Sequence, residues 1–135
     1  MPPSTKILKL YRNLLDIATT EFRVIIESGE IFYSPSKEPW KLRLYLCDGS
    51  FIDIYYSTNG KYSYHWDRRL LSNKIYRHDN APHQRWSDIS TFPKHFHNGS
   101  EDSAIASHIS DNPELALNEF LNFAIKHIIA ERNRK

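Results

Sequence analysis

The segment at residues 41–57, "KLRLYLCDGSFIDIYYS", constrains the fold of this chain more than any other. Apolar residues alternate with polar ones on both sides of the Asp48-Gly49 pair, which is the period of a half-buried β-strand. The apolar set is Leu42, Leu44, Leu46, Ile52, Ile54 and Tyr56. An Asp-Gly pair between two such runs favours a tight hairpin turn. The sequence therefore predicts an antiparallel hairpin with one buried face.

Further strands are predicted on both sides of this hairpin. Residues 21–34 alternate weakly and break at Gly29, which indicates a strand pair or a strand and a bend. Residues 61–67 follow an Asn-Gly turn signal and read as a strand, as do residues 74–79. Residues 80–92 favour a loop. A short edge strand is expected at residues 92–97, because Pro93 cannot donate a ladder hydrogen bond.

A helix is predicted at each end of the chain. Residues 6–18 have apolar side chains at helical spacing, and Ser4 or Thr5 can cap that helix. Near the C-terminus, Asn112 is a cap and Pro113 takes the first helical position. The buried stripe of this second helix would be Leu117, Phe120, Leu121, Ala124, Ile125 and Ile128.

This element order predicts an α+β fold: an N-terminal helix, an antiparallel β-meander sheet, and a C-terminal helix packed on one sheet face. With 135 residues, the chain fits a single domain, 1–135. Its core would span about 6–130, followed by a short charged tail that frays. The other sheet face is expected to be partly exposed.

Apolar runs, the N-terminal pattern and the cysteine count indicate where in the cell the protein is located. No apolar run approaches the length of a membrane span, and the N-terminus lacks the pattern of a signal peptide. The single cysteine, Cys47, excludes an internal disulfide and is expected to be a buried, inert thiol. We therefore expect a cytoplasmic protein that makes no membrane contact.

Histidine is concentrated in residues 75–97, which hold four of the seven histidines. The surrounding segment, residues 65–97, carries a formal charge of +3 without histidine, whereas the whole chain carries only +2. Positive charge is thus focused where the histidines are, which suits an anionic partner such as RNA.

The residue types suit metal-independent RNA cleavage. One imidazole would remove the proton of a ribose 2′-hydroxyl, and a second would protonate the leaving 5′-oxygen. We predict His83 and His97 as this pair, with His95 or Asp79 as an orienting group. A guanidinium would stabilise charge on the phosphoryl oxygens. The predicted substrate-binding residues are Arg77, Arg85, Lys94, His65, Tyr64 and Trp66, the last two as part of an aromatic stripe able to stack on bases.

Other interpretations stay open. His95 and His97 with a third histidine or Asp79 could hold a transition metal, as in a metal-dependent phosphodiesterase or nucleotide-modifying enzyme. The basic surroundings disfavour that reading, so no metal and no cofactor are predicted. The basic face could also bind nucleic acid or an acidic partner without catalysis. His108 and His127 read as ordinary structural or solvated residues.

Three segments, "KYSYHW", "IYRHDNAPH" and "STFPKHFHNGSE", resemble the signature of the TumE family of toxins from prokaryotic toxin–antitoxin systems. The run "LRLYLCDGSFIDIYY" resembles that family's first hairpin, and the resemblance covers roughly residues 14–128. It implies a toxin that a protein antitoxin neutralises. Small toxins with helices and a sheet are frequently ribonucleases, which is an analogy of fold. A homo-oligomer is a further open prediction.

Two positions depart from the family pattern. The family usually has a second histidine after "DNAPH", where this chain has Gln84, and a histidine directly after "TFP", where this chain has Lys94. If the position of Gln84 carries acid–base chemistry, this chain would be impaired. The histidines that match, His83, His95 and His97, are therefore the preferred site residues.

Overall fold

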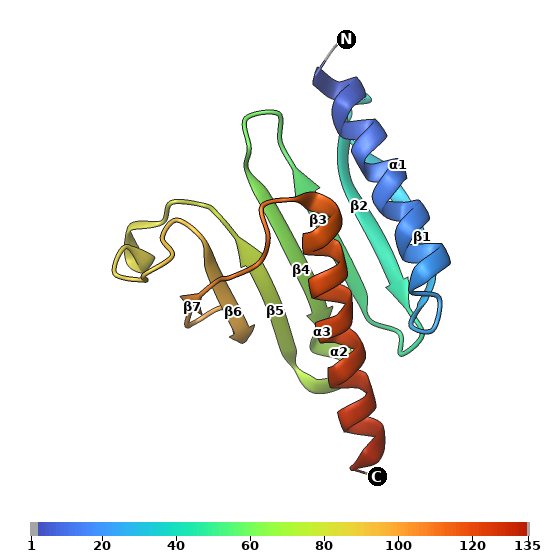
Figure 1. Ribbon diagram of the computed structural model, residues 1–135, viewed down its shortest axis with the longest axis vertical. Helices are drawn as coiled ribbons and strands as arrows, with labels where there is room; N and C mark the ends of the chain where they lie inside the picture. Colours follow the sequence, from blue (N-terminus) through green and yellow to red (C-terminus); the bar gives the residue numbers. More distant parts are fainter. Residues whose placement is uncertain (1–2, 135) are drawn as a thin grey trace.

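A seven-stranded antiparallel sheet with two long helices on one face makes up the computed structural model, which describes residues 3–134 (Figure 1). The long helices are α1 (Pro3–Glu21) and α3 (Pro113–Asn133). The strands are β1 (Ile26–Tyr33), β2 (Pro39–Leu46), β3 (Phe51–Tyr56), β4 (Tyr62–Arg68), β5 (Lys74–Asp79), β6 (His95–Gly99) and β7 (Ile105–Ala106). Two short helices are α2 (Arg69–Ser72) and η1 (Gln84–Trp86).

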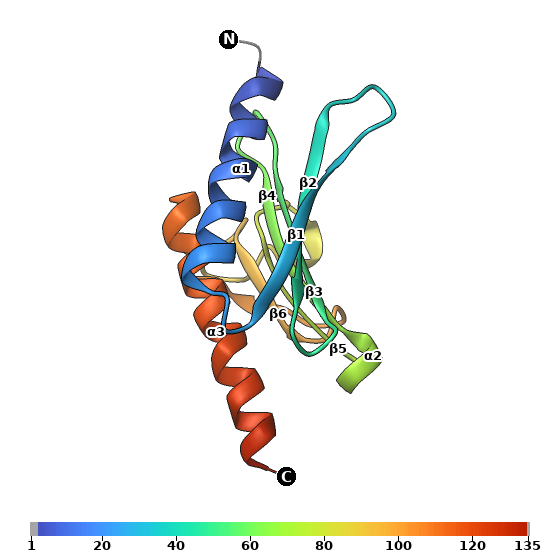
Figure 2. The ribbon, with the colours of Figure 1, turned by 90° about the vertical axis from the view of Figure 1, so that its right-hand side faces the viewer.

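The strands pair in chain order from β1 to β7, so the sheet is a simple meander. The helix α1 contacts β1 and β2, and α3 packs over β4, β5 and β6 through its aromatic residues. Both long helices lie on the same side of the sheet (Figure 2). The predicted α+β class and the order of elements are therefore confirmed.

The core lies between the sheet and the two helices. The predicted hairpin is correct: its alternate apolar residues are at most 2% exposed on the helix-facing side, except Tyr56, which is partly buried. Gly49 and Gly60 adopt positive φ angles of 89° and 87° at the two hairpin turns, which glycine tolerates without strain. Asn112 caps α3 by accepting the backbone N–H of Leu115, as predicted.

Several boundary predictions are wrong. The first helix begins at Pro3, so Ser4 and Thr5 lie inside it and do not cap it. The strand β1 runs through Gly29 without a turn. A Cβ atom there would lie 2.5 Å from Leu15 Cδ1 and 3.0 Å from the carbonyl oxygen of Arg43. Glycine at this position therefore permits close packing of α1 on the sheet and does not break the strand.

Three further expectations differ from the structure. The strand β6 is not an edge strand, because β7 pairs with it. Cys47 is exposed, because it lies in the turn after β2 where the alternation ends. The charged tail that was expected to fray, residues 131–135, is helical as far as Asn133, and Lys135 lies outside the described residues. No helix within residues 3–134 combines the length and the apolar character needed to cross a membrane.

Candidate functional site

The candidate site lies on the sheet face opposite to the long helices, at the β4–β5–β6 end. Two cross-strand rows build it. In one row, His65 of β4 pairs with Arg77 of β5, which pairs with His97 of β6. In the next row, Asp79 of β5 pairs with His95 of β6. Because strand neighbours two residues apart point to the same side, all five side chains share this face.

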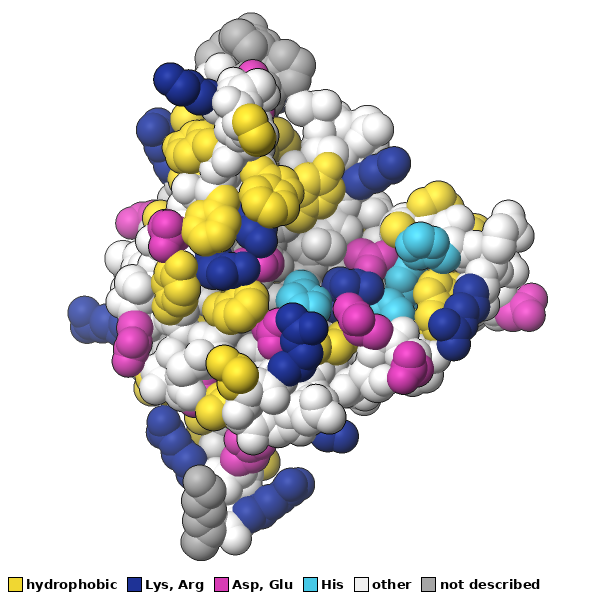
Figure 3. All heavy atoms as spheres, turned by 180° about the vertical axis from the view of Figure 1, so that it is seen from behind, with side chains coloured by type: hydrophobic (Ala, Val, Ile, Leu, Met, Phe, Trp, Pro, Cys, Tyr) yellow, Lys and Arg dark blue, Asp and Glu magenta, His cyan; other side chains and the backbone are white. Residues whose placement is uncertain are grey.

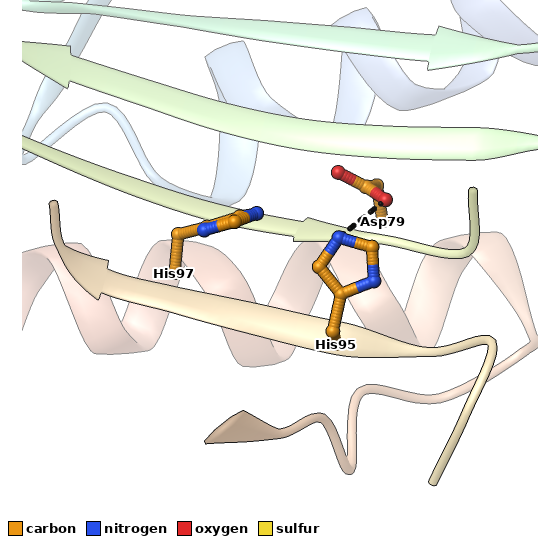
Figure 4. Close-up of side chains that lie close together, drawn as sticks. All are labelled: Asp79, His95 and His97. Carbon is orange, nitrogen blue, oxygen red and sulfur yellow. Dashed lines mark ion pairs between the residues drawn. The ribbon is translucent and has the colours of Figure 1, made fainter. Parts of the chain in front are cut away.

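Asp79, His95 and His97 form the centre of the site (Figure 4). The Nε2 atom of His95 lies 3.0 Å from Oδ1 of Asp79, and the two histidine rings are 5.0 Å apart between centroids. The three residues offer one ligand-type atom each within 4.8 Å of one another. His95 is 1% exposed, His97 is 2% exposed and Asp79 is 7% exposed, so this polar cluster is buried.

Backbone carbonyls hold both buried imidazoles. The Nδ1 atom of His95 lies 3.0 Å from the carbonyl oxygen of Pro93, and that of His97 lies 2.9 Å from the carbonyl oxygen of Ser103. A carbonyl oxygen can only accept, so Nδ1 carries the hydrogen in each ring. The Nε2 atoms are therefore the reactive atoms of both rings, and both rings extend toward Asp79 (Figure 4).

Arg77 and Glu101 complete the polar surroundings. Arg77 donates from Nε to Oδ2 of Asp79 at 3.1 Å and from a terminal nitrogen to Glu101 at 3.1 Å. The backbone N–H of Ala81 donates to Oδ1 of Asp79 at 3.0 Å. The carboxylate of Asp79 is therefore fixed in orientation by a neighbouring cation and by its own loop.

The segment between β5 and β6 covers the cluster. The Trp86 ring of η1 lies 5.6 Å from the His97 ring and 6.2 Å from the His95 ring, between centroids. His83 is exposed at the edge, with its ring 6.5 Å from that of His95. Arg85 lies over Trp86 and donates to the carbonyl oxygen of Asp102 at 2.7 Å. Figure 3 shows histidine side chains grouped with basic and acidic ones on this face.

Burial affects the protonation of two histidines here. It lowers the pKa of His97, and the positive charge of Arg77 acts in the same direction. Burial also lowers the pKa of His65, again with a contribution from Arg77. The Nε2 atom of His65 lies 3.7 Å from Asp67. Both rings therefore stay neutral to lower pH than a histidine in water.

Three predicted substrate-binding residues lie elsewhere. Tyr64 and Trp66 are fully buried on the helix-facing side, where Tyr64 packs on Phe120 and Trp66 on Phe123. Their prediction as base-stacking rings is wrong because alternation along β4 sends them into the core. Lys94 bonds to the carbonyl oxygen of Ile109 and pairs with Asp111, away from the cluster.

Two neighbours of the cluster were not predicted from the sequence. Trp86 covers the imidazoles, and Glu101 pairs with the arginine beside Asp79. No local sequence pattern marks either residue as part of the site. The one available hint is that Trp86 is an aromatic residue in a polar loop.

Gln84, at the position where the family usually has histidine, is exposed at the start of η1. A pocket of about 230 Å³ also adjoins Asp79, lined by Tyr55, Lys61, Tyr62, Ser63, Arg77, Asp79, Asn80 and Ala81.

The fold and the site define a small α+β protein with a buried His–His–Asp cluster on the open face of its sheet. The chain belongs to the TumE family, because the family model described as "Toxin TumE" matches residues 14–129, which is most of its length. Membership makes it a toxin of a toxin–antitoxin system and implies an antitoxin partner. Searches of curated proteins and of solved structures found no significant match.

Proposed function

We propose that this toxin acts on RNA by cleaving the phosphodiester backbone, with its reaction centre at the polar cluster of β5, β6 and the segment between them. One observation carries the proposal. His83, His95, His97 and Asp79 come from separate positions along the chain, yet they meet on one face beside Arg77. This is a set of proton-transfer groups beside a fixed cation.

His83 is the proton-transfer group that a substrate reaches first. It is exposed, and it lies beside the buried His95. Arg85 lies at the same edge, with its guanidinium over Trp86. A guanidinium there would bind a phosphate and bring the scissile bond to His83. His65 and Arg77 extend the same face toward the middle of the sheet.

A metal-independent mechanism would use His97 as the second proton-transfer group. Its Nε2 atom is the one free of a backbone partner, and Asp79 and His95 would orient it. Such a role needs contact with substrate, whereas His97 is 2% exposed under Trp86. This mechanism therefore requires η1 to move away from β6 when RNA binds.

The test compares two exposed histidines. His83→Ala should lower the rate of RNA cleavage by about 10²- to 10⁴-fold, the usual contribution of a general acid or base. His108→Ala is the matched control, because His108 is also exposed and belongs to neither the cluster nor its cover. Cleavage of a labelled RNA by the tag-free chain is measured, in parallel with growth arrest on expression.

Two results would contradict the proposal. Intact RNA at stoichiometric enzyme, with and without added divalent cations, would rule out cleavage. Unchanged cleavage by His83→Ala would remove His83 from the reaction. Growth arrest that persists without any cleavage would favour the alternative of a toxin that only binds its target.

A further inference from the structure

We infer that Asp79, His95 and His97 form a binding site for one divalent transition-metal ion. Each residue offers one ligand-type atom, and these atoms lie within 4.8 Å of one another in a buried position. Two imidazoles and one carboxylate are a common ligand set for zinc and for iron(II) in proteins. The binding itself does not rest on the proposed RNA cleavage.

The histidines are held as metal ligands usually are. Each ring uses Nδ1–H to bond a backbone carbonyl, that of Pro93 for His95 and that of Ser103 for His97. Metal-binding histidines almost always donate their other ring N–H to a carbonyl or carboxylate, which fixes the ring. Both Nε2 atoms are left with a lone pair directed into the cluster (Figure 4).

The spacing of His95 and Asp79 is compatible with two ligands of one ion. Nε2 of His95 lies 3.0 Å from Oδ1 of Asp79, yet it makes no hydrogen bond with any atom of residues 3–134. With the hydrogen on Nδ1, this Nε2 atom and the carboxylate oxygen are both acceptors, so they cannot hydrogen-bond to each other directly. Ligands at about 2.1 Å from one ion lie about 3.0–3.4 Å apart when adjacent. A buried nitrogen without a partner is costly, and an ion would satisfy it.

The protein uses one acceptor position on each oxygen of Asp79. Oδ2 accepts from Arg77, and Oδ1 accepts from the backbone N–H of Ala81. One lone pair of Oδ1 remains on the side of the histidines. Metal-binding carboxylates are themselves hydrogen-bonded in this way, and these outer partners strengthen metal binding.

The local charge permits a cation, against the expectation from the sequence. Of the six basic residues in the 65–97 segment, only Arg77 contacts the cluster, and Glu101 pairs with it. Arg68 pairs with Asp48 and Glu131, Arg69 pairs with Asp67, and Lys94 pairs with Asp111. The charges of Arg68, Arg69 and Lys94 are thus paired with carboxylates outside the cluster.

Three protein ligands leave at least one coordination position for water, the pattern of catalytic rather than structural sites. Imidazole ligands favour Zn²⁺, Fe²⁺ or Co²⁺ over Mg²⁺ and Ca²⁺. When the ion is bound, both Nε2 atoms are occupied, so His95 and His97 cannot transfer protons. His83 then remains as the proton-transfer histidine of the site.

The experiment measures metal binding by the full-length chain after removal of any purification tag. Protein stripped with EDTA is titrated with Co²⁺, and visible absorption bands report nitrogen coordination. Zn²⁺ competition then gives a stoichiometry, which should be one ion per chain. The imidazole NMR signals of His95 and His97 should shift with Zn²⁺, whereas those of His108 should not.

Variants test the assignment of the ligands. His97→Asn and Asp79→Asn should each weaken Zn²⁺ binding by at least tenfold, while His108→Asn should leave it unchanged. Circular dichroism checks that each variant folds. If a cluster variant does not fold, the NMR shifts of the unmodified chain still decide the assignment.

The outcomes separate this inference from the proposed function. Stoichiometric binding at these residues supports the inference, whether or not the chain cleaves RNA. Absence of cobalt bands together with unshifted imidazole signals would overturn it. Cleavage of RNA by chain that binds no metal would overturn the metal site and leave the proposed function standing.

Discussion

Two histidines on neighbouring strands show how one residue type takes opposite roles in this protein. His78 of β5 points toward the helices, stacks on Phe96 with ring centroids 4.1 Å apart, and bonds to Ser107. His95 of β6 points to the other face and lies beside Asp79. Asp79, next to His78 in the chain, also points to that other face. The two-residue alternation of strands therefore separates a core histidine from a site histidine.

His78 should make the stability of the protein depend on pH. Burial lowers the pKa of His78 to about 4, and the charge of Lys94 acts in the same direction. Below pH 6.5, His78 is protonated in the unfolded chain but stays neutral in the folded chain. The free energy of unfolding therefore falls as the pH falls from 6.5 toward 4. The loss from this residue is at most about 3 kcal/mol.

Chemical denaturation between pH 7 and pH 4.5 measures this effect. In His78→Leu, the slope of unfolding free energy against pH should decrease by up to about 1.4 kcal/mol per pH unit. His108→Gln is the control and should keep the original slope, since His108 is exposed. An unchanged slope in His78→Leu would mean that His78 is not held neutral by the fold.

At the scale of the elements, the short helix η1 lies over the candidate site. It consists of only three residues, and none of them is buried. Its Trp86 ring nevertheless lies against both cluster imidazoles. An element with so few packing contacts opens at low free-energy cost. The same segment carries the exposed His83, so its movement would bring the outer and inner histidines to one substrate.

Covering by Trp86 can be measured through the reactivity of the imidazoles. In EDTA-stripped protein, diethyl pyrocarbonate should modify His83 and His108 quickly and His95 and His97 slowly. Trp86→Ala should raise the reaction of His95 and His97 several-fold, because it removes their cover.

Peptide mass spectrometry assigns each modified histidine. Trp40→Ala is the control, since Trp40 is 51% exposed and belongs to β2, away from the cluster. If His95 reacts as fast as His83 in the unchanged protein, the cluster is open and Trp86 does not control access.

At the scale of the whole molecule, α3 is the element that completes the core behind the site. Its Phe120 is 1% exposed and packs on Tyr64 and His78 from two neighbouring strands. The helix α1 covers β1 and β2 at the other end of the sheet. Burying one face leaves the other face free to present polar groups, which is where the cluster lies.

Phe120→Ala should lower the free energy of unfolding by about 3–5 kcal/mol, because it removes a large buried ring and leaves a cavity. Urea denaturation followed by circular dichroism measures the change. Ile129→Ala, on the same helix but 50% exposed, should cost less than about 1.5 kcal/mol. Equal losses in both variants would mean that α3 does not pack on the sheet as described.

Local sequence patterns were sufficient for most of the fold. Alternation around Asp48-Gly49 predicted the central hairpin and its buried face, and the Asn112-Pro113 pair predicted the start of α3. Both signals depend on neighbours within a few residues. Gly29 was misread as a strand break, because its actual role is contact with α1, which is distant in the chain.

For the candidate site, too, some features follow from the local sequence and others depend on contacts between distant parts of the chain. The sequence by itself determined which residues have side chains able to transfer protons or bind phosphate, because the density of histidine and arginine in one segment is a property of composition. The tertiary structure decided which of them meet. Strand register put Asp79, His95 and His97 together, sent Tyr64 and Trp66 into the core, and turned Lys94 toward Asp111. A shift of register by one residue would exchange the two faces, so composition alone could not decide this.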